Sequence, residues 1–250
     1  MQRLFAEDPM IRPMVDFAAK TGAEPPMMIL EPFQKTLWDA RKTRPLTMQE
    51  IKWIMKGCLL GIMTVHRNGL VYTDLKMENV GVSGFDNEKP NDDPRQIKVR
   101  LADLGSISEP GTREISALTY RGPEVHFGKP WDYSTDYAQL LLAHVDFKSP
   151  GMYDNIDPGS FEEKEEKIKA VRDALAIDFE LHSLPFYTED ARARELLPPP
   201  QAEQAYKWTE DMFDKGIAQE DIQFLANVLN PLPRARDTTV EILESRYLEI

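Results

Sequence analysis

Residues 72–79 read Tyr-Thr-Asp-Leu-Lys-Met-Glu-Asn and place three chemically capable side chains close together. An aspartate such as Asp74 can accept the proton of a hydroxyl group. A lysine two residues later, Lys76, can reach a phosphate, and Asn79 can supply a neutral oxygen to Mg²⁺. These side chains suit the transfer of a phosphoryl group to a hydroxyl. The segment alone could equally be a polar loop after a helix, so further signals are needed.

Three later segments add further candidate residues. Ala102-Asp103-Leu104-Gly105 lies at the end of a predicted strand, with Asp103 29 residues beyond Asp74. An Asp-x-Gly triplet alone is an ordinary turn signal, so its value lies in this position. Residues 120–125, Tyr-Arg-Gly-Pro-Glu-Val, place Glu124 21 residues after Asp103, and residues 131–136 open an apolar helix that contains Asp136.

In this order, the segments resemble the catalytic loop, the Asp-Phe-Gly motif and the Ala-Pro-Glu step of eukaryotic protein kinases. The resemblance covers about residues 10–248 and leans toward the SR-protein kinases, which share the Thr before the catalytic Asp and the Tyr-Arg before Pro-Glu. It implies that Asp74 is the catalytic base and that Lys76 contacts the transferred phosphate. Asn79 and Asp103 are then the Mg²⁺ ligands.

The same resemblance assigns roles to residues outside the catalytic loop. Glu124 is expected to pair with a late arginine, with Arg236 as the first candidate and Arg234 as the alternative. Asp136 matches the aspartate that ties down the catalytic loop, although a first-turn acid is also favoured by the helix dipole alone.

Residues 27–33 resemble the strand and hinge that hold adenine. Leu30 is the implied gatekeeper, and the backbone of Glu31 and Phe33 is expected to hydrogen-bond the base. The alternative is a buried strand that ends at a proline and has no role in function.

The chain also departs from the family pattern. No Gly-x-Gly-x-x-Gly and no Val-Ala-x-Lys precede the hinge, Tyr72 stands where His is usual, and Thr73 stands where Arg is usual. Without that arginine, control by phosphorylation of the activation loop is less expected. We expect residues 1–33 to be a remnant of the small lobe with the hinge, and residues 34–250 to form the C-terminal lobe.

The expected elements are a few strands followed by many helices. Thr47 and Glu50 form a capping box before a helix over 47–65 with one apolar face. The polar stretch 85–95 predicts a surface loop. The fold class is therefore α+β, a protein-kinase-like fold with a mostly helical C-lobe and a truncated small β lobe. Further strands are expected at 10–17, 27–33, 80–82 and 97–102, and further helices at 135–146, 161–178, 201–214, 219–229 and 238–246.

The composition of the chain limits the classes of partner that it can bind. The formal net charge of −12 argues against nucleic acid and against acidic membranes as partners. Cys58 is the only cysteine, so an intrachain disulfide is excluded, and no apolar run approaches the length of a bilayer span. We expect a cytoplasmic or nuclear protein.

Three functions remain open. The first is an ATP- and Mg²⁺-dependent protein kinase, Ser/Thr type by resemblance, that acts on protein substrates. The second is a pseudokinase that serves as a binding scaffold, favoured by the missing upstream elements and opposed by the intact Asp74, Lys76, Asn79 and Asp103. The third, a small-molecule kinase, is opposed by the Pro-Glu step and the late arginine. The sequence predicts neither the particular protein substrate nor the oligomeric state.

Overall fold

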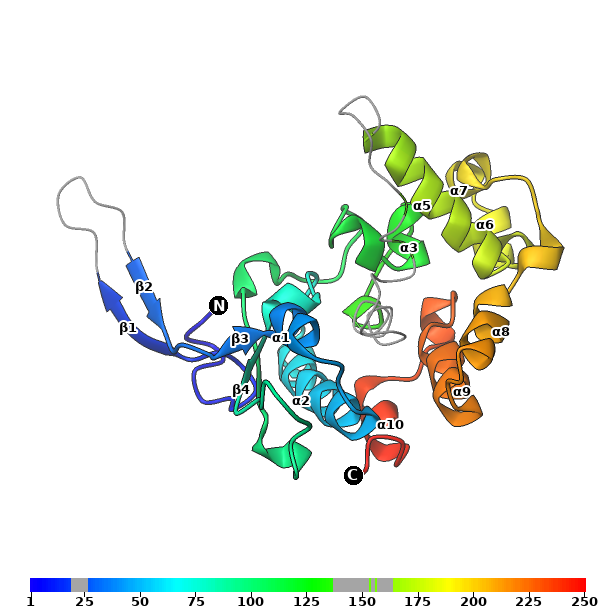
Figure 1. Cartoon of the computed structure of the whole chain (residues 1–250). Coiled ribbons are helices and arrows are strands. Elements are labelled where there is room, and N and C mark those ends of the chain that lie inside the picture. Colours follow the sequence, from blue (N-terminus) through cyan, green and yellow to red (C-terminus); the bar gives the residue numbers. More distant parts are fainter. Residues whose placement is uncertain (19–26, 137–152, 154–155, 157–163) are drawn as a thin grey trace. The chain divides into compact units, whose positions relative to one another are not determined.

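The computed structural model describes residues 1–18, 27–136, 153, 156 and 164–250. The chain divides into two compact units, one formed by Met1–Ser108 with Thr239–Ile250 and the other by Glu109–Thr238. Figure 1 labels their helices and strands. Within the described residues, the named strands all belong to the first unit and the second is built from helices. The predicted α+β class is confirmed.

Helix α2 (Met48–Arg67) is the centre of the first unit. It begins where the sequence predicts, because the Thr47 side chain accepts the N–H of Glu50 while the Glu50 side chain accepts the N–H of Thr47. It ends at Asn68, followed by Gly69 with φ +75°. The buried face of α2 supplies much of the core of this unit. The prediction of a helix over 47–65 is confirmed.

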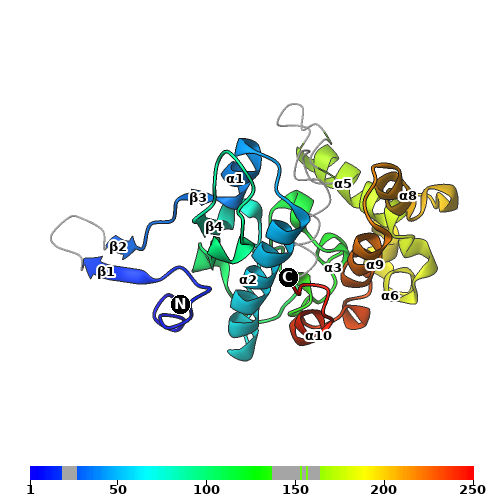
Figure 2. The ribbon, with the colours of Figure 1, turned by 60° about the horizontal axis from the view of Figure 1, so that its bottom comes forward.

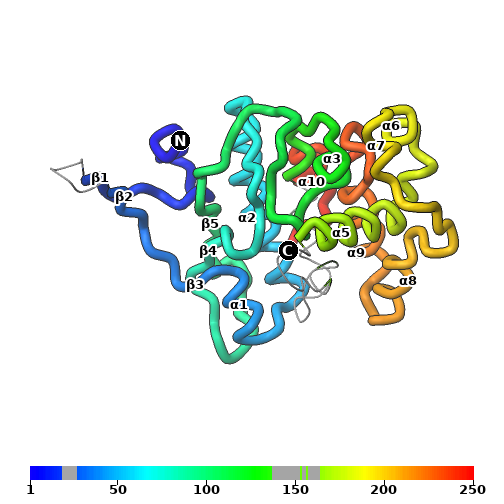
Figure 3. Tube along the Cα trace, turned by 90° about the horizontal axis from the view of Figure 1, so that it is seen from above, coloured from blue at the N-terminus to red at the C-terminus, as the bar shows by residue number. Residues whose placement is uncertain are grey.

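A three-stranded antiparallel sheet in the order β3–β4–β5 lies beside α2 (Figure 3). Its strands are β3 (Lys35–Thr36), β4 (Val80–Ser83) and β5 (Lys98–Leu101). The unit also contains α1 (Leu37–Thr43), which packs on β4, and α10 (Thr239–Glu244), which packs on α2. The strands predicted near 80–82 and 97–102 are therefore confirmed.

Close packing between α2 and β5 depends on two glycines. A Cβ at Gly57 would lie 2.8 Å from the Val99 Cβ, and one at Gly61 would lie 2.9 Å from Leu101 Cδ1. The first contact would force the helix away from the strand, and the second would displace the Leu101 side chain. These glycines therefore let α2 approach β5 closely, which fixes the place of the β4–β5 hairpin.

The other two strands form an antiparallel ribbon, β1 (Met14–Ala18) with β2 (Met27–Leu30). They are shorter than the predicted 10–17 and 27–33. Ile11 makes a parallel bridge to Leu101 of the main sheet instead of joining the ribbon. Several large apolar side chains of the ribbon are exposed, among them Val15 at 64% and Met27 at 56%.

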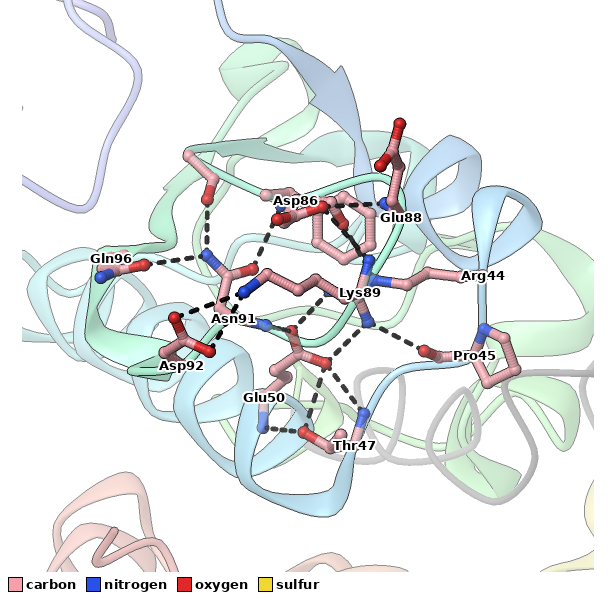
Figure 4. Close-up of polar contacts among 12 residues, drawn as sticks. Arg44, Pro45, Thr47, Glu50, Asp86, Glu88, Lys89, Asn91, Asp92 and Gln96 are labelled. Atoms are coloured by element: carbon pink, nitrogen blue, oxygen red, sulfur yellow. Dashed lines mark hydrogen bonds and ion pairs between the residues drawn. The ribbon is translucent and has the colours of Figure 1, made fainter.

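The stretch predicted as a surface loop, 85–95, is held by Glu50 (Figure 4). The Glu50 carboxylate accepts hydrogen bonds from both terminal nitrogens of the Arg44 guanidinium, at 2.9 and 2.7 Å. It also accepts the Asn91 N–H at 3.0 Å. Arg44 Nε donates to the Asp86 carbonyl at 2.9 Å, and Phe85 is buried. The prediction of a surface loop is confirmed, because the stretch is mostly exposed and joins β4 to β5, and a buried ion pair and a buried aromatic ring anchor it.

The Glu50→Gln variant is expected to lose about 1.5–3 kcal/mol of unfolding free energy at neutral pH, because it removes charge-assisted hydrogen bonds. Burial alone raises the pKa of the Glu50 carboxyl. The Arg44 side chain and the N–H groups of Thr47 and Asn91 outweigh burial and hold that pKa below the ordinary 4.5. A depressed pKa stabilises the fold above about pH 4.5, and this stabilisation is lost as the pH falls through the folded-state value.

Urea unfolding of wild type and Glu50→Gln, measured from neutral to acid pH, checks this expectation. The stability difference should shrink toward zero in acid. Glu88→Gln, which changes an exposed carboxyl in the same loop, serves as the control and should match the wild type throughout. A difference that persists undiminished in acid contradicts the assignment.

The second unit contains six helices among its described residues, some of which Figure 2 shows from another side. A cluster of large rings forms part of its core, with Phe127 and Tyr187 edge to face at 5.5 Å between centroids. Phe179 and Trp208 form a second ring contact at 5.8 Å between centroids, and Trp131 is buried as well. The helices are α3 (Pro123–His126), α5 (Lys164–Asp178), α6 (Pro185–Thr188), α7 (Ala191–Leu196), α8 (Lys207–Asp214) and α9 (Gln219–Val228).

Several helix predictions need correction. The helix predicted over 201–214 is interrupted, because Tyr206 takes a left-handed conformation with φ 56° and only α8 follows it. The helices predicted over 161–178, 219–229 and 238–246 correspond to α5, α9 and α10. Most of the predicted helix 135–146 lies outside the described residues, which show only its start at 135–136. No helix in the described ranges is both long and apolar enough to cross a membrane.

Candidate active site

The structure brings Asp74, Lys76 and Asn79 together. Lys76 Nζ lies 2.9 Å from Asp74 Oδ2. Asn79 Nδ2 donates to the Asp74 backbone carbonyl at 2.8 Å and to Asp74 Oδ2 at 3.0 Å. The side chains of Asp74 and Lys76 are 21% and 28% exposed, so both can meet a ligand from solvent. An ammonium and an amide thus converge on one oxygen of the Asp74 carboxylate.

Residues Val71–Thr73 fasten this loop to the segment after β5. Val71 and Ser108 exchange both backbone hydrogen bonds, at 2.8 and 3.1 Å. The buried Tyr72 hydroxyl donates to the Ala102 carbonyl, and Thr73 Oγ1 donates to the Ser106 carbonyl at 2.8 Å. Tyr72 and Thr73, which the sequence marks as departures from the family pattern, therefore both hold the loop in place. Thr73 does so in a left-handed conformation with φ 68°.

Asp103 lies at the same end of the β4–β5 hairpin as Asn79. Asn79 directly precedes β4, and Asp103 is the second residue after β5. Between them, the Ala102 N–H donates to the Asn79 carbonyl at 2.8 Å. Asp103 has φ 51° and an exposed side chain, whose Oδ1 accepts the Gly105 N–H at 3.3 Å. The pairing of β4 with β5 is what places these two side chains at one edge.

The oxygen donors at this edge fit a hard cation. Both hydrogen bonds of the Asn79 side chain use Nδ2, so its Oδ1 is available, and the Asp103 carboxylate is open to solvent. Mg²⁺ is commonly bound by one or two protein oxygens together with phosphate oxygens and water. The described residues contain no group of three or more His, Cys, Asp and Glu side chains that could hold a metal ion.

The predicted hinge residues lie next to the same sheet. The Glu31 N–H donates to the Pro13 carbonyl at 3.0 Å, and the Glu31 carbonyl accepts Arg12 Nε at 2.7 Å. The Glu31 carboxylate pairs with Arg100. Leu30 ends β2 and is half-buried. Arg12, which the sequence did not single out, therefore anchors the hinge.

The Phe33 ring lies directly against Gly81 in the middle of β4. A Cβ at Gly81 would come within 2.5 Å of Phe33 Cδ1, so only glycine permits this contact. The guanidinium of Arg12 stands 4.5 Å from the centre of the Phe33 ring. The cavity between Glu31, Phe33 and Gly81 has a volume of about 100 Å³. It is smaller than the roughly 300 Å³ typical of the smallest ligand pockets.

In the second unit, Glu124 is joined to Arg236 and not to the alternative, Arg234. Both guanidinium nitrogens lie 2.7 Å from the carboxylate oxygens, and both side chains are 0% exposed. Arg236 Nε also donates to the Asn230 carbonyl at 2.6 Å. The pair therefore links the Pro-Glu step to residues 230–236. Asp136, at the end of the described part of its segment, is fully buried.

Comparisons with known proteins agree with this architecture. The family described as protein kinase domain matches residues 9–248. The probable serine/threonine-protein kinase gdt4 of Dictyostelium discoideum is 30% identical over 96 residues, 34% of this chain and 6% of the relative. Homeodomain-interacting protein kinase 1 of Caenorhabditis elegans is 27% identical over 145 residues, 52% of this chain and 16% of the relative. The chain thus matches only a small part of the length of these relatives.

A solved structure supports the fold. A chain in the crystal structure of the yeast RNA Pol II CTD kinase CTDK-1 complex superposes with a TM-score of 0.72 at 18% identity, covering 98% of this chain and 78% of that chain. At this identity the likeness establishes the fold alone. The family match, in contrast, runs from residue 9 to residue 248 of a 250-residue chain. This chain therefore belongs to the protein kinase family.

Proposed function

We propose that the chain transfers the γ-phosphoryl group of ATP to serine or threonine hydroxyls of protein substrates. The observation that carries this proposal is the convergence of Lys76 and Asn79 on the Asp74 carboxylate, at 2.9 and 3.0 Å, beside the hairpin end that holds Asp103. Phosphoryl transfer needs chiefly positioning and charge neutralisation, and this group of side chains can supply both.

Each side chain has a distinct part in the proposed reaction. Asp74 orients the substrate hydroxyl and accepts its proton through the carboxylate, which stays partly exposed. Lys76 neutralises charge on the transferred group. Asn79 Oδ1 and the Asp103 carboxylate hold Mg²⁺, which when bound neutralises charge on the phosphates. Asn79 has a second part, because its Nδ2 fixes the Asp74 carboxylate in one orientation.

The adenine is proposed to lie at the hinge. Leu30 bounds the site, the Glu31 carbonyl has a second lone pair for the base, and the Phe33 N–H is the expected donor. The volume of about 100 Å³ beside Phe33 means that the Phe33 ring must turn away from Gly81 to admit the base.

In the same proposal, Glu124, Asp136 and Arg236 have structural roles. Residues 1–33 belong to a small lobe, and residues 34–250 belong to the large lobe. The proposed location is cytoplasmic or nuclear.

A second candidate is a protein-binding scaffold without phosphotransfer. The observation that favours it is the hinge, where the Phe33 ring fills the space over Gly81 and Arg12 occupies the Glu31 carbonyl. The arrangement around Asp74 favours the enzyme, because a scaffold has no need of a lysine and an amide directed at one carboxylate oxygen. The particular resemblance to the SR-protein kinases within the family stays a prediction.

The test is a transfer assay with γ-labelled ATP, Mg²⁺ and a degenerate peptide library that contains serine, threonine or tyrosine at its centre. We expect label on the serine and threonine peptides only, and no label when EDTA removes the metal. Label on tyrosine peptides would overturn the Ser/Thr assignment. No label on any peptide, by a chain shown to be folded, would leave the scaffold as the function.

A further inference from the structure

A cavity of about 290 Å³ opens between α2, β5 and the segment around Pro9 and Met10, within the first unit. Trp53 and Leu60 of α2 and Val99 of β5 supply apolar walls. The Trp53 indole is fixed, because its Nε1 donates to the Ile97 carbonyl at 2.7 Å. This volume, near the roughly 300 Å³ of the smallest ligand pockets, suits one or two apolar side chains.

All the ionisable side chains that line this cavity are basic. They are Lys56, Arg95, Lys98 and Arg100, in a chain whose formal net charge is −12. Arg95 is paired with Asp93 and Arg100 with Glu31, whereas Lys56 and Lys98 make no ion pair with any described residue. A basic rim around an apolar cavity on an acidic protein favours an occupant that is both acidic and apolar.

The backbone beside the cavity can also bind a peptide. β5 is an outer strand of its sheet, and Leu101 turns its N–H and C=O away from β4 toward Met10 and Arg12. Alternate residues of a strand direct their backbone groups to the same side, so those of Val99 also point away from β4. An extended segment at this edge can hydrogen-bond Val99 while its side chains enter the cavity.

We propose that this α2–β5 cavity docks an extended acidic peptide of a partner protein. One or two apolar side chains of the peptide fill the space between Trp53, Leu60 and Val99, and flanking Asp or Glu residues pair with Lys56 and Lys98. The cavity shares Lys98 and Arg100 with the hinge cavity, but its apolar walls Trp53 and Leu60 and its Lys56 take no part in the proposed phosphotransfer. The proposal therefore stands or falls independently of that activity.

The experiment measures binding of a fluorescein-labelled peptide by fluorescence anisotropy to the full 250-residue chain. In the probe peptide, Asp and Glu residues flank a Leu-Val-Leu centre. One comparison peptide replaces the centre by Ser-Ser-Ser, and another replaces the acids by lysines. The probe should bind, and both comparison peptides should bind at least about tenfold more weakly. Added salt should lower the affinity of the probe peptide for the chain.

Matched variants locate the binding. The double variant Lys56→Glu/Lys98→Glu should lose at least about tenfold in affinity, since it replaces two attractions by repulsions. Lys207→Glu/Lys215→Glu reverses two exposed lysines of the other unit and should bind like the wild type. Leu60→Ser removes an apolar wall without a change of charge and should also weaken binding. Circular dichroism melts confirm that each variant is folded.

Four results would overturn the proposal. They are no binding of the probe, equal binding of the serine-centred peptide, unchanged affinity in Lys56→Glu/Lys98→Glu, and self-association of the chain that this double variant abolishes. The second would mean a charge-only site of the kind that polyanions occupy. The last would mean that a second copy of the chain, not an acidic peptide, covers the cavity.

Discussion

The Asp74→Asn variant is expected to transfer phosphate about 10²–10⁴-fold more slowly than the wild type, the usual contribution of a positioned general base. Asparagine has nearly the shape of aspartate, and its oxygen can still accept the bonds from Lys76 Nζ and Asn79 Nδ2. It cannot take the proton of a hydroxyl at neutral pH. The fold and the Mg²⁺–ATP affinity should therefore persist while the chemical step fails.

Single-turnover transfer, with ATP affinity measured separately by calorimetry, distinguishes these effects. Asp92→Asn is a suitable control, because Asp92 is an exposed carboxylate in the 85–95 loop that pairs with Lys89 at 3.4 Å and lies outside the proposed site. The control should keep the wild-type rate. An Asp74→Asn protein that transfers phosphate at the wild-type rate would remove Asp74 from the role of base.

Removal of the Glu124 charge is expected to produce the largest loss of stability. The Glu124→Gln variant should lose about 3–5 kcal/mol of unfolding free energy, because the Arg236 guanidinium is left as an unpaired buried charge. Neither side chain has any exposure to water that could replace the missing partner. The geometry is also tight at Gly122, where a Cβ would lie 2.6 Å from Glu124 Oε1.

Urea unfolding followed by tryptophan fluorescence measures this loss, since Trp131 and Trp208 are buried in the same unit. Arg234→Gln is the matched control and should change stability little, because Arg234 is exposed. The double variant Glu124→Gln/Arg236→Met should be more stable than Glu124→Gln alone, since it leaves no buried charge unpaired. A Glu124→Gln protein as stable as the wild type would contradict this account of the pair.

Local sequence patterns predicted the parts of the structure that depend on neighbouring residues. The capping box of Thr47 and Glu50, the apolar face of α2 and the short strands β4 and β5 all follow from spacing within one element. Asp74, Lys76 and Asn79 lie within one loop, so their meeting also follows from spacing once the loop is recognised.

The parts that the sequence did not reveal depend on contacts between distant residues. Arg44 reaches Asp86, and Arg12 reaches Glu31, across stretches of chain that carry no periodic signal. The short helices α6 and α7 contain too few residues to show an apolar stripe. The prolines at the start of α6 and α3 were the available signal, because proline favours the first position of a helix.

The residues that depart from the family pattern show a further limit of motif reading. A tyrosine at position 72 in place of the usual histidine suggests that the loop has lost the side chain that holds it in place. In the structure, the buried Tyr72 hydroxyl instead donates a hydrogen bond to the Ala102 carbonyl. A motif specifies which residue is usual, whereas the requirement is physical: a donor that reaches the backbone after β5.

We propose that the edge with Asn79 and Asp103, together with the hinge, forms a working nucleotide–metal site. Calorimetric titration of the purified chain with ATP, with and without Mg²⁺, tests it most directly, and Asp103→Asn is the matched variant. We expect heat of binding that requires Mg²⁺ and is lost in Asp103→Asn. No binding at millimolar ATP by a folded wild-type chain, or equal binding by Asp103→Asn, would contradict it.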